Sequence, residues 1–517
     1  MLSFFNKRFF IIFLFPILLG GITVFSFQPY NLFFINFLSL PLLFFIIIYV
    51  KKKSKSIYIK KPFLKNLFIL GTSYGFGFFF FGIYWIAHSL TFDETFKFLI
   101  PFSLILIPLF LSLFFSLPIV LVGNFCEKNL SSIFLLSSVF SLSDFVRSKI
   151  LTGFPWNIWS YSFSWSLENL QILYKIGFFS FNILVITIFF MPTILFFKNN
   201  YKYYILSFFL ILIFSNYFYG SYKLNSYESN SNLNGINFKI ISAGMNLNEF
   251  KDDIKTASKL IKYSEPDKNK KTIFIWPEGI FLSENFNKKK DIQELFANNF
   301  SQNHLIIFGA NTSQDGSFKK KYFNSMIFSD KNLNFISKYD KRKLVPFGEF
   351  LPFESFLKSI GLKKITPGYS SFSKGKKNSL ISIDFDKKNI NFLSLICYEI
   401  IFPGLEEDYS KFNFIINISE DAWFGESIGP HQHFAKAIFR SIESGVYTIR
   451  SANKGISAFI NPQGKILKNL QPNEIGNIEL RLPIIEETKK QFKKDLIFLF
   501  LLITYILTFF VLRKFKL

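Results

Sequence analysis

Long apolar runs alternate with short polar segments over the first two-fifths of the chain, and one more run lies near the C-terminus. Each run approaches the roughly 20 residues that an α-helix needs to cross the hydrocarbon core of a bilayer. The pattern predicts about eight transmembrane helices, of which the fifth is short enough to be partly re-entrant. In chain order the runs are Phe9–Phe25, Leu32–Val50, Leu67–Ala87, Phe98–Val122, Ile133–Val146, Ile176–Phe197, Tyr204–Phe218 and Leu496–Leu512.

Lysine and arginine are distributed unevenly over the short loops between these runs. If the N-terminus is inside, the inner loops hold most of the positive charge, including the lysines of 51–55 and 60–65. The outer short loops hold Lys97, Arg147, Lys149 and Lys175. Because basic loops stay on the cytoplasmic side, this distribution predicts that the region between the seventh and eighth runs lies outside the cytoplasm.

That region alternates short strand-like stretches with amphipathic helical ones. The strand-like stretches are Phe238–Ser242, Thr272–Trp276, Leu305–Phe308, Tyr322–Phe328, Phe335–Lys338, Asn391–Ile396, Phe412–Ile416 and Ile456–Ile460. The helical stretches are Asn248–Lys262, Asp291–Phe300 and His433–Glu443. This alternation predicts an α/β domain whose sheets are covered by helices. We therefore expect a seven-helix transmembrane domain at 1–219, an α/β domain at 220–494, and a C-terminal helix with a basic tail at 495–517.

Composition and charge narrow the classes of protein further. Half of the 517 residues are hydrophobic, and the formal net charge is +24. A basic chain often binds nucleic acid, but a domain outside the cytoplasm is a poor candidate for that partner. The two cysteines, Cys126 and Cys397, exclude a disulfide scaffold, and the predicted topology puts them on opposite sides of the membrane. Cys397 would then be an unpaired thiol in an oxidising compartment, which indicates a function.

Three strand-like stretches of the α/β region lead into residues with useful chemistry. Glu278 follows Trp-Pro, where proline ends a central strand, and a partly desolvated carboxylate suits a general base. Lys341 follows a strand and can stabilise an oxyanion as a compact charge. Cys397 ends an apolar strand, where a nearby cation or helix N-terminus would give it the depressed pKa of a nucleophile. Each signal alone is weak, because surface glutamates, solvated lysines and buried cysteines are common.

The order Glu-Lys-Cys resembles the catalytic triad of the nitrilase superfamily. The segments Lys341–Glu349, Cys397–Glu399, Asp421–Gly425 and Leu151–Trp156, with the seven-plus-one helices, resemble the apolipoprotein N-acyltransferase family in particular. That resemblance implies an α/β/β/α sandwich domain. It implies transfer of an acyl chain from a membrane phospholipid to the N-terminal amine of a diacylglyceryl-cysteine apolipoprotein, through a cysteine thioester. It also implies a bacterial inner-membrane protein with a periplasmic catalytic domain and neither metal nor organic cofactor.

The resemblance also implies roles for single residues. Glu278 would be the base, Cys397 the nucleophile, and Lys341, with backbone N–H groups after the cysteine, would hold the oxyanion. Supporting or substrate-binding roles would fall to Glu349, Tyr398, Glu399 and Trp423.

Two segments depart from the family pattern. Segment 243–251 lacks the tryptophan that the family usually carries after the first strand of this domain. Glu420 stands before Asp421, where the family more often has asparagine or a similar small polar residue. Neither departure affects the triad, but the first leaves an aromatic substrate contact without a counterpart.

Several other polar residues are better explained by structure than by chemistry. The i,i+2 spacing of His431 and His433 is poor for a metal site and favours capping or hydrogen bonding. Arg440, Glu443 and Arg450 are expected to form a structural ion network.

Two groups of aromatic residues have similarly simple explanations. Trp156, Trp159 and Trp165 are expected to anchor an outer loop in the membrane interface. The expected role of Phe347, Phe350, Phe353 and Phe356 is ordinary core packing, with a lid or acyl-chain wall as the alternative.

Two other functions remain open from the sequence. A membrane-tethered nitrilase-type amidase would use the same triad with water as the acceptor, although it would not need eight helices or the Leu-Thr-Gly-Phe-Pro-Trp loop. A non-catalytic lipid-binding scaffold would not need the triad.

Overall fold

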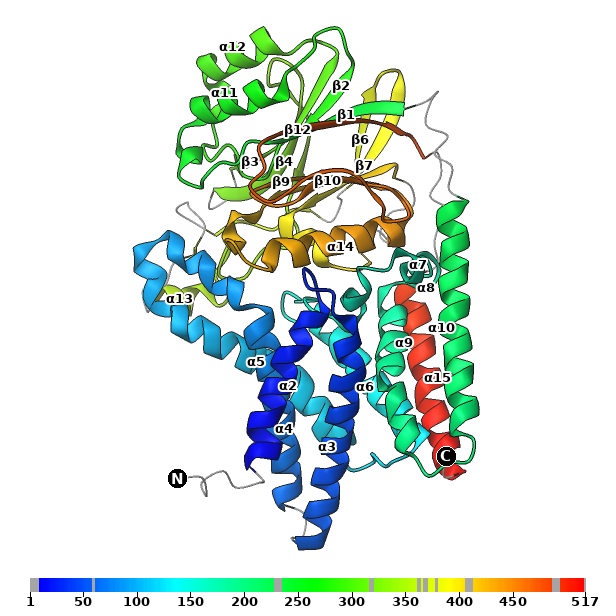
Figure 1. Ribbon diagram of the computed structural model, residues 1–517. Helices are drawn as coiled ribbons and strands as arrows, with labels where there is room; N and C mark the ends of the chain where they lie inside the picture. The colour runs from blue at the N-terminus through cyan, green and yellow to red at the C-terminus, as the bar shows by residue number, and fades with distance from the viewer. Residues whose placement is uncertain are drawn as a thin grey trace. The chain divides into compact units, whose positions relative to one another are not determined.

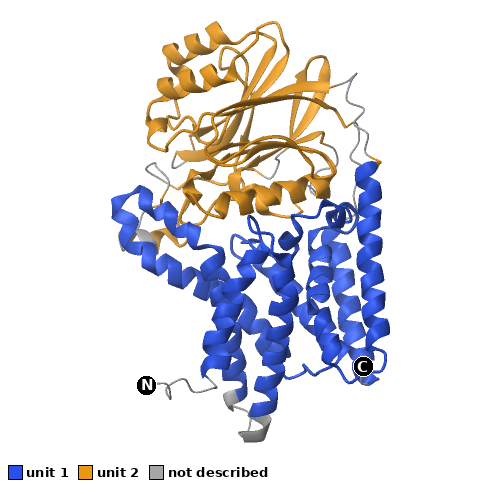
Figure 2. Cartoon of the chain, in the orientation of Figure 1, with its two compact units in different colours: residues 1–225, 492–517 blue, residues 226–491 orange. Residues whose placement is uncertain are grey.

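The computed structural model divides into two compact units (Figure 2). Unit 1 comprises Met1–Asn225 and Phe492–Leu517, and unit 2 comprises Ser226–Gln491. The structure describes residues 9–57, 61–226, 235–315, 320–359, 364–365, 371–376, 380–404, 412–485 and 493–515.

Unit 1 is helical throughout its described length, apart from turns and loops (Figure 1). Its α-helices are α2 (Phe15–Thr23), α3 (Asn36–Ile57), α4 (Lys61–Gly82), α5 (Ile100–Val122), α6 (Leu130–Lys149), α7 (Leu167–Leu170), α8 (Leu173–Ile176), α9 (Phe178–Phe190), α10 (Lys202–Asn225) and α15 (Lys494–Lys514). Its π and 3₁₀ segments are η2 (Phe10–Leu14), η3 (Val24–Ser26), η4 (Phe33–Ile35), η5 (Tyr84–Phe92), η6 (Glu94–Leu99), η7 (Trp159–Phe163) and η8 (Met191–Phe196).

Each of the eight apolar runs coincides with helix. Among the described residues, 6 helices are long and apolar enough to cross a membrane, or 7 if the bent pair Phe63–Gly82 and Tyr84–Phe92 is one span. The first run is the shorter apolar helix Phe10–Ser26. The third run bends by 48° after Gly82, so its last residues belong to η5. The fifth run is a complete helix of 20 residues, α6, and the expectation of a re-entrant segment was wrong.

The loop after α6 is held by a buried ion pair. Arg147 donates to Asp144 at 2.8 Å and to the backbone carbonyls of Phe154 and Trp156 at 2.7 and 2.8 Å. These bonds draw the loop inward, and Trp156 and Trp159 are each only 1% exposed. The expected interfacial anchoring was therefore wrong for both, whereas Trp165 is 44% exposed.

Unit 2 contains two six-stranded sheets. The first has the order β12-β1-β2-β3-β4-β5 and the second the order β11-β10-β9-β8-β7-β6. The strands of the first are β1 (Gly235–Ser242), β2 (Thr272–Ile275), β3 (His304–Gln314), β4 (Lys321–Ser329), β5 (Phe335–Asp340) and β12 (Gly476–Pro483). Those of the second are β6 (Leu380–Phe385), β7 (Lys388–Ile396), β8 (Phe414–Glu420), β9 (Tyr447–Asn453), β10 (Ser457–Ile460) and β11 (Ile466–Leu470).

Three helices of unit 2 lie on the outer faces of the sheets. Figure 1 shows α11 and α12 over the first sheet and α14 over the second. The bounds are α11 (Asp253–Ser264), α12 (Lys290–Asn299), α13 (Glu354–Ser359), α14 (Gly429–Ser444), η9 (Glu249–Lys251), η10 (Phe286–Lys288), η11 (Cys397–Ile401) and η13 (Asp421–Phe424). The predicted α/β/β/α sandwich, in a chain with about eight apolar helices, is confirmed.

Alternation of side chains along the strands builds two apolar layers. On β2, Ile273 and Ile275 enter the core between the two sheets, where they join Phe414 of the second sheet. Phe274, and Trp276 just beyond the strand, point the other way and pack in the core beneath α11 and α12. A strand buried on both faces is apolar without interruption, and for this reason β2 was recognisable from sequence.

The strand-like stretches were confirmed as β1, β2, β3, β4, β5, β7, β8 and β10, with shifted ends. Sequence analysis missed β6, β9, β11 and β12. β9 contains Arg450 and Asn453, both fully buried, and buried polar residues interrupt the apolar pattern. The other three lie at or next to a sheet edge, where one strand face is more exposed.

Glycines let two helices of unit 1 approach closely. A Cβ at Gly77 of α4 would lie 2.0 Å from the carbonyl oxygen of Ile17, and one at Gly20 of α2 would lie 2.1 Å from that of Tyr74.

We expect Gly77→Val to destabilise unit 1 by about 1–3 kcal/mol, because the side chain forces the helix backbones apart. Thermal unfolding in detergent measures the effect. The control is Ile22→Val on α2, where the side chain is 49% exposed; equal melting temperatures for the two variants would contradict the packing argument.

Candidate active site

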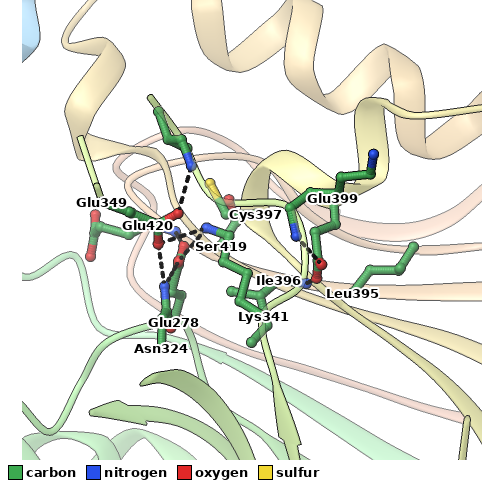
Figure 3. Close-up of polar contacts among 12 residues, drawn as sticks. Glu278, Asn324, Lys341, Glu349, Leu395, Ile396, Cys397, Glu399, Ser419 and Glu420 are labelled. Atoms are coloured by element: carbon green, nitrogen blue, oxygen red, sulfur yellow. Dashed lines mark hydrogen bonds and ion pairs between the residues drawn. The ribbon is translucent and has the colours of Figure 1, made fainter. Parts of the chain in front are cut away.

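Three strand ends bring the predicted triad to one region of unit 2 (Figure 3). Glu278 lies three residues beyond β2, Lys341 directly follows β5, and Cys397 directly follows β7. β2 and β5 belong to the first sheet and β7 to the second. The site therefore forms where the ends of strands from both sheets meet.

Backbone pairing with β3 fixes the position of Glu278. The N–H of Gly309 donates to the carbonyl of Pro277 at 3.0 Å, and the N–H of Ile280 donates to the carbonyl of Gly309 at 3.0 Å. A Cβ at Gly309 would lie 2.5 Å from the Cα of Glu278. The close approach of the two backbones therefore requires glycine at 309.

Lys341 is the charged centre of the site. Its ammonium donates to Oε1 of Glu278 at 3.2 Å and to Oε1 of Glu349 at 3.0 Å, and the residue is 1% exposed. Burial alone would lower the pKa of Lys341, but the charges of Glu278 and Glu349 outweigh it and raise the pKa above its usual value. Lys341 is therefore a fixed cation.

Asn324, which sequence analysis missed, joins the two carboxylates. Its Nδ2 donates to Oε1 of Glu278 and to Oε1 of Glu349, each at 2.7 Å. It lies on β4, and its carbonyl accepts from the N–H of Lys341 at 2.9 Å. The available signal was a single asparagine within an otherwise largely apolar stretch, Tyr322–Phe328. That signal indicates that Asn324 is buried, but it does not identify the residues to which Asn324 is hydrogen-bonded.

Cys397 has a strained backbone and a protonated thiol. Its φ is +48°, in the left-handed region that non-glycine residues rarely adopt. Burial, followed by the charge of Glu278, raises the pKa of the Cys397 thiol above its usual value, although Lys341 acts in the opposite direction. The expected depressed pKa was wrong, because desolvation and the neighbouring carboxylate outweigh the cation. The thiol must therefore lose its proton to a base during its reaction.

The predicted supporting residues lie in different environments. Glu349 belongs to the charged cluster and also accepts from the N–H of Val345 at 2.9 Å. Glu399 instead braces the two sheets: it accepts from the hydroxyl of Tyr339 on β5 at 2.7 Å and from the N–H of Ile396 on β7 at 2.8 Å. Tyr398 is 9% exposed.

Two aromatic side chains of the predicted supporting set lie close to these elements. The ring of Tyr398 packs edge-on against Phe402, with 5.1 Å between centroids. Trp423 is half-buried in η13.

Glu420 holds Glu278 through a backbone hydrogen bond. Its N–H donates to Oε2 of Glu278 at 2.9 Å. Its carboxyl accepts from Asn453 and from the N–H of Ala422 at 3.0 Å, and burial raises its pKa well above the usual range. Asn453 in turn bonds the backbone of Met245, so the two segments that depart from the family pattern are linked here.

His433 follows the structural explanation, since it is fully buried and its Nε2 is hydrogen-bonded to a backbone carbonyl. His431 is half-buried. No three His, Cys, Asp or Glu side chains in the described part of the chain form a group that could hold a metal. The expected ion network is partly wrong: Arg440 pairs with Glu443 at 2.9 Å, but Arg450 pairs with Asp421 at 2.8 Å.

The loop around Glu349 exposes aromatic side chains. Phe347 is 49% exposed and Phe353 is 83% exposed, so the expectation of core packing was wrong for both. Phe350 is half-buried, and the side chain of Phe356 lies outside the described set.

The raised thiol pKa leads to a pH prediction. A raised pKa means that less thiolate is present at any given pH, so alkylation of Cys397 by iodoacetamide should still accelerate at pH 9, beyond the usual thiol pKa of about 8.5. Peptide mass spectrometry of the intact protein gives the rate, and a free cysteine peptide in the same solution is the control. A rate at Cys397 that levels off below pH 8 would show a preformed thiolate and contradict this prediction.

Comparison with known proteins matches both units. Residues 19–191 match the apolipoprotein N-acyltransferase N-terminal domain, and residues 268–490 match carbon-nitrogen hydrolase. The apolipoprotein N-acyltransferase of Rhizobium leguminosarum bv. trifolii (strain WSM2304) is 30% identical over 485 residues, covering 89% of this chain and 88% of the relative. That of Rickettsia prowazekii (strain Madrid E) is 30% identical over 477 residues, covering 90% and 91%.

Among solved structures, Nit3 of Saccharomyces cerevisiae, from branch 10 of the nitrilase superfamily, is 19% identical and covers 48% of this chain and 90% of its own, with a TM-score of 0.35. The two domain matches and the relatives matched along nearly their whole length confirm the resemblance found in the sequence. The chain belongs to the apolipoprotein N-acyltransferase family.

Proposed function

We propose that Glu278, Lys341 and Cys397 transfer an acyl chain from a membrane phospholipid to the N-terminal α-amine of a diacylglyceryl-cysteine apolipoprotein. The observation that carries this proposal is the buried ammonium of Lys341, hydrogen-bonded to Glu278, with Cys397 beside it at the end of the neighbouring sheet (Figure 3). Base, cation and nucleophile then occupy one site, in a chain of this family.

In the first half-reaction, Cys397 attacks the ester carbonyl of the phospholipid. The sulfur–carbon bond forms as the thiol proton passes to the carboxylate of Glu278, which is consistent with a thiol that is neutral at rest. The carbonyl oxygen becomes an oxyanion beside Lys341 and the backbone N–H that follows Cys397. The carbon–oxygen ester bond then breaks, Glu278 returns the proton to the leaving oxygen, and a thioester and a lysophospholipid result.

In the second half-reaction, the apolipoprotein amine attacks the thioester carbonyl. A second tetrahedral oxyanion forms in the same place, and Glu278 accepts the proton that the amine nitrogen loses. The carbon–sulfur bond breaks, the thiolate of Cys397 takes the proton back from Glu278, and the amide is released. Glu349 and Asn324 hold Lys341 and Glu278 in place during both halves.

The substrates of this proposal explain the apolar unit 1. Both are lipid-anchored, and moving an acyl chain from the bilayer into water costs about 0.8 kcal/mol per CH₂. A catalytic domain tethered at the membrane avoids that cost. We place the protein in the bacterial inner membrane with residues 220–494 on the periplasmic side, on the support of the lysine-rich loops at 51–55 and 60–65.

Mass spectrometry of the full-length protein incubated with phospholipid alone tests the first half-reaction. We expect an acyl adduct on Cys397 that is lost when a diacylated lipopeptide is added, with the acyl chain appearing on the peptide amine. Cys397→Ser should form no such thioester and should retain the wild-type melting temperature. Appearance of free fatty acid instead of acylated peptide would favour the amidase-type alternative, in which water is the acceptor.

Asn324 provides a separate test of the charged cluster. Asn324→Leu keeps the size of the side chain but removes the donor to Glu278 and Glu349. Because hydrogen bonds to charged groups contribute about 1.5–3 kcal/mol, we expect acyl-enzyme formation to slow by on the order of 10–100-fold. Asn311→Leu is the matched control, since Asn311 pairs with Asn324 across β3 and β4 and bonds the carbonyl of Leu282 instead. Equal rates of acyl-enzyme formation for the two variants would show that Asn324 does not contribute to the site.

A further inference from the structure

The peptide group between Cys397 and Tyr398 is contacted by a histidine side chain of α14 at its carbonyl oxygen. The Nε2 atom of His433, on α14, lies 3.2 Å from the backbone carbonyl oxygen of Cys397. His433 is fully buried, and its ring packs edge-on against Phe424, with 5.3 Å between centroids. The contact joins a buried helix residue to the one strained backbone position among the proposed triad residues.

The partners of His433 define its protonation. A carbonyl oxygen only accepts hydrogen bonds, so Nε2 must carry a hydrogen and donate it to Cys397. On the other side of the ring, Nη2 of Arg450 lies 3.1 Å from Nδ1 and Oδ1 of Asp421 lies 3.0 Å from it. A neutral ring with a lone pair on Nδ1 accepts from the guanidinium, and burial, followed by the charge of Arg450, lowers the pKa of His433 to about 4.

Asp421 is satisfied without a proton from the imidazole. Its Oδ2 accepts from Nη2 of Arg450 at 2.8 Å, and its Oδ1 accepts from the hydroxyl of Ser419 at 2.7 Å. The carboxylate and guanidinium neutralise each other behind the ring, which keeps His433 neutral and fixes its orientation.

A peptide group is planar and trans, so its C=O and N–H point in opposite directions. Fixing the carbonyl of Cys397 therefore also fixes the direction of the N–H of Tyr398, which belongs to the same peptide group. We propose that His433 is a positioning residue, which, by holding the Cys397 carbonyl, directs the Tyr398 N–H at the oxyanion formed in both half-reactions. This inference rests on the proposed function and adds a residue to it.

Two substitutions at 433 separate the hydrogen bond from the packing. His433→Phe keeps a ring against Phe424 but cannot donate, whereas His433→Gln has an amide N–H at a similar reach. Removing a donor to the oxyanion typically lowers the rate by on the order of 10²–10³-fold. A donor that is present but misdirected should lower the rate by less. We expect acyl-enzyme formation in His433→Phe to fall by on the order of 10–100-fold, and His433→Gln to recover most of it.

A second reaction of the same thiol distinguishes positioning from a structural role. Alkylation by iodoacetamide forms the sulfur–carbon bond as iodide leaves, and it passes through no oxyanion. We therefore expect both variants to be alkylated at Cys397 within about threefold of the wild-type rate. His431→Phe, at a half-buried position on the same helix, is the control and should change neither reaction.

The outcomes are distinct. If His433→Phe forms the acyl-enzyme at the normal rate, or if acylation and alkylation fall together, His433 does not act by orienting the oxyanion donor. If the wild-type protein forms no adduct on Cys397 with phospholipid, the proposed function fails, and that result is independent of position 433. Circular dichroism melting of each variant, with a wild-type transition expected for His433→Gln, identifies a variant that has merely unfolded.

Discussion

Burial of the Lys341 ammonium is the constraint on which the rest of the site depends. An isolated buried charge costs several kcal/mol, and the loss is recovered only where partners and geometry are nearly ideal. Its partners Glu278 and Glu349, with Asn324 joining them, come from β4 and from loops that follow β2 and β5. The buried charge of Lys341 is stable only when β4 and the loops after β2 and β5 are correctly positioned. Folding of the sheet and assembly of the charged cluster therefore depend on each other.

The same cluster sets the chemistry of the thiol. Burial, followed by the charge of Glu278, raises the pKa of the Cys397 thiol and keeps its proton in place, although Lys341 acts in the opposite direction. A neutral resting thiol resists oxidation and alkylation better than a thiolate does. In the proposed mechanism, reaction then requires a substrate carbonyl in place, because only the oxyanion beside Lys341 compensates for transferring the proton to Glu278.

The sequence was informative wherever periodicity or a strand end determined the structure. The apolar runs predicted the helices, and the ends of β2, β5 and β7 predicted where Glu278, Lys341 and Cys397 would lie. The sequence did not reveal hydrogen-bond partners that are distant along the chain. Asn324, for example, was recognisable only as a polar residue in a buried strand. The sequence was misleading where a local cue was outweighed, as for the thiol pKa, and where the loop bonded to Arg147 carries Trp156 and Trp159 inward.

A sequence signal nevertheless exists for the residues that were missed. β7, β8 and β9 are parallel neighbours, so their carboxyl ends lie at one edge of the sheet. β8 begins with Phe414-Ile415-Ile416 and β9 with Tyr447-Thr448-Ile449, and the two strands end in Ser419-Glu420 and Ser451-Ala452-Asn453, although both are buried throughout. Polar residues concentrated in the second half of buried parallel strands cannot be explained by solvent exposure; they must bond one another, as Glu420 and Asn453 do. A change from apolar to polar along such a strand therefore marks the functional edge of the sheet, and it is visible in the order of the amino acids.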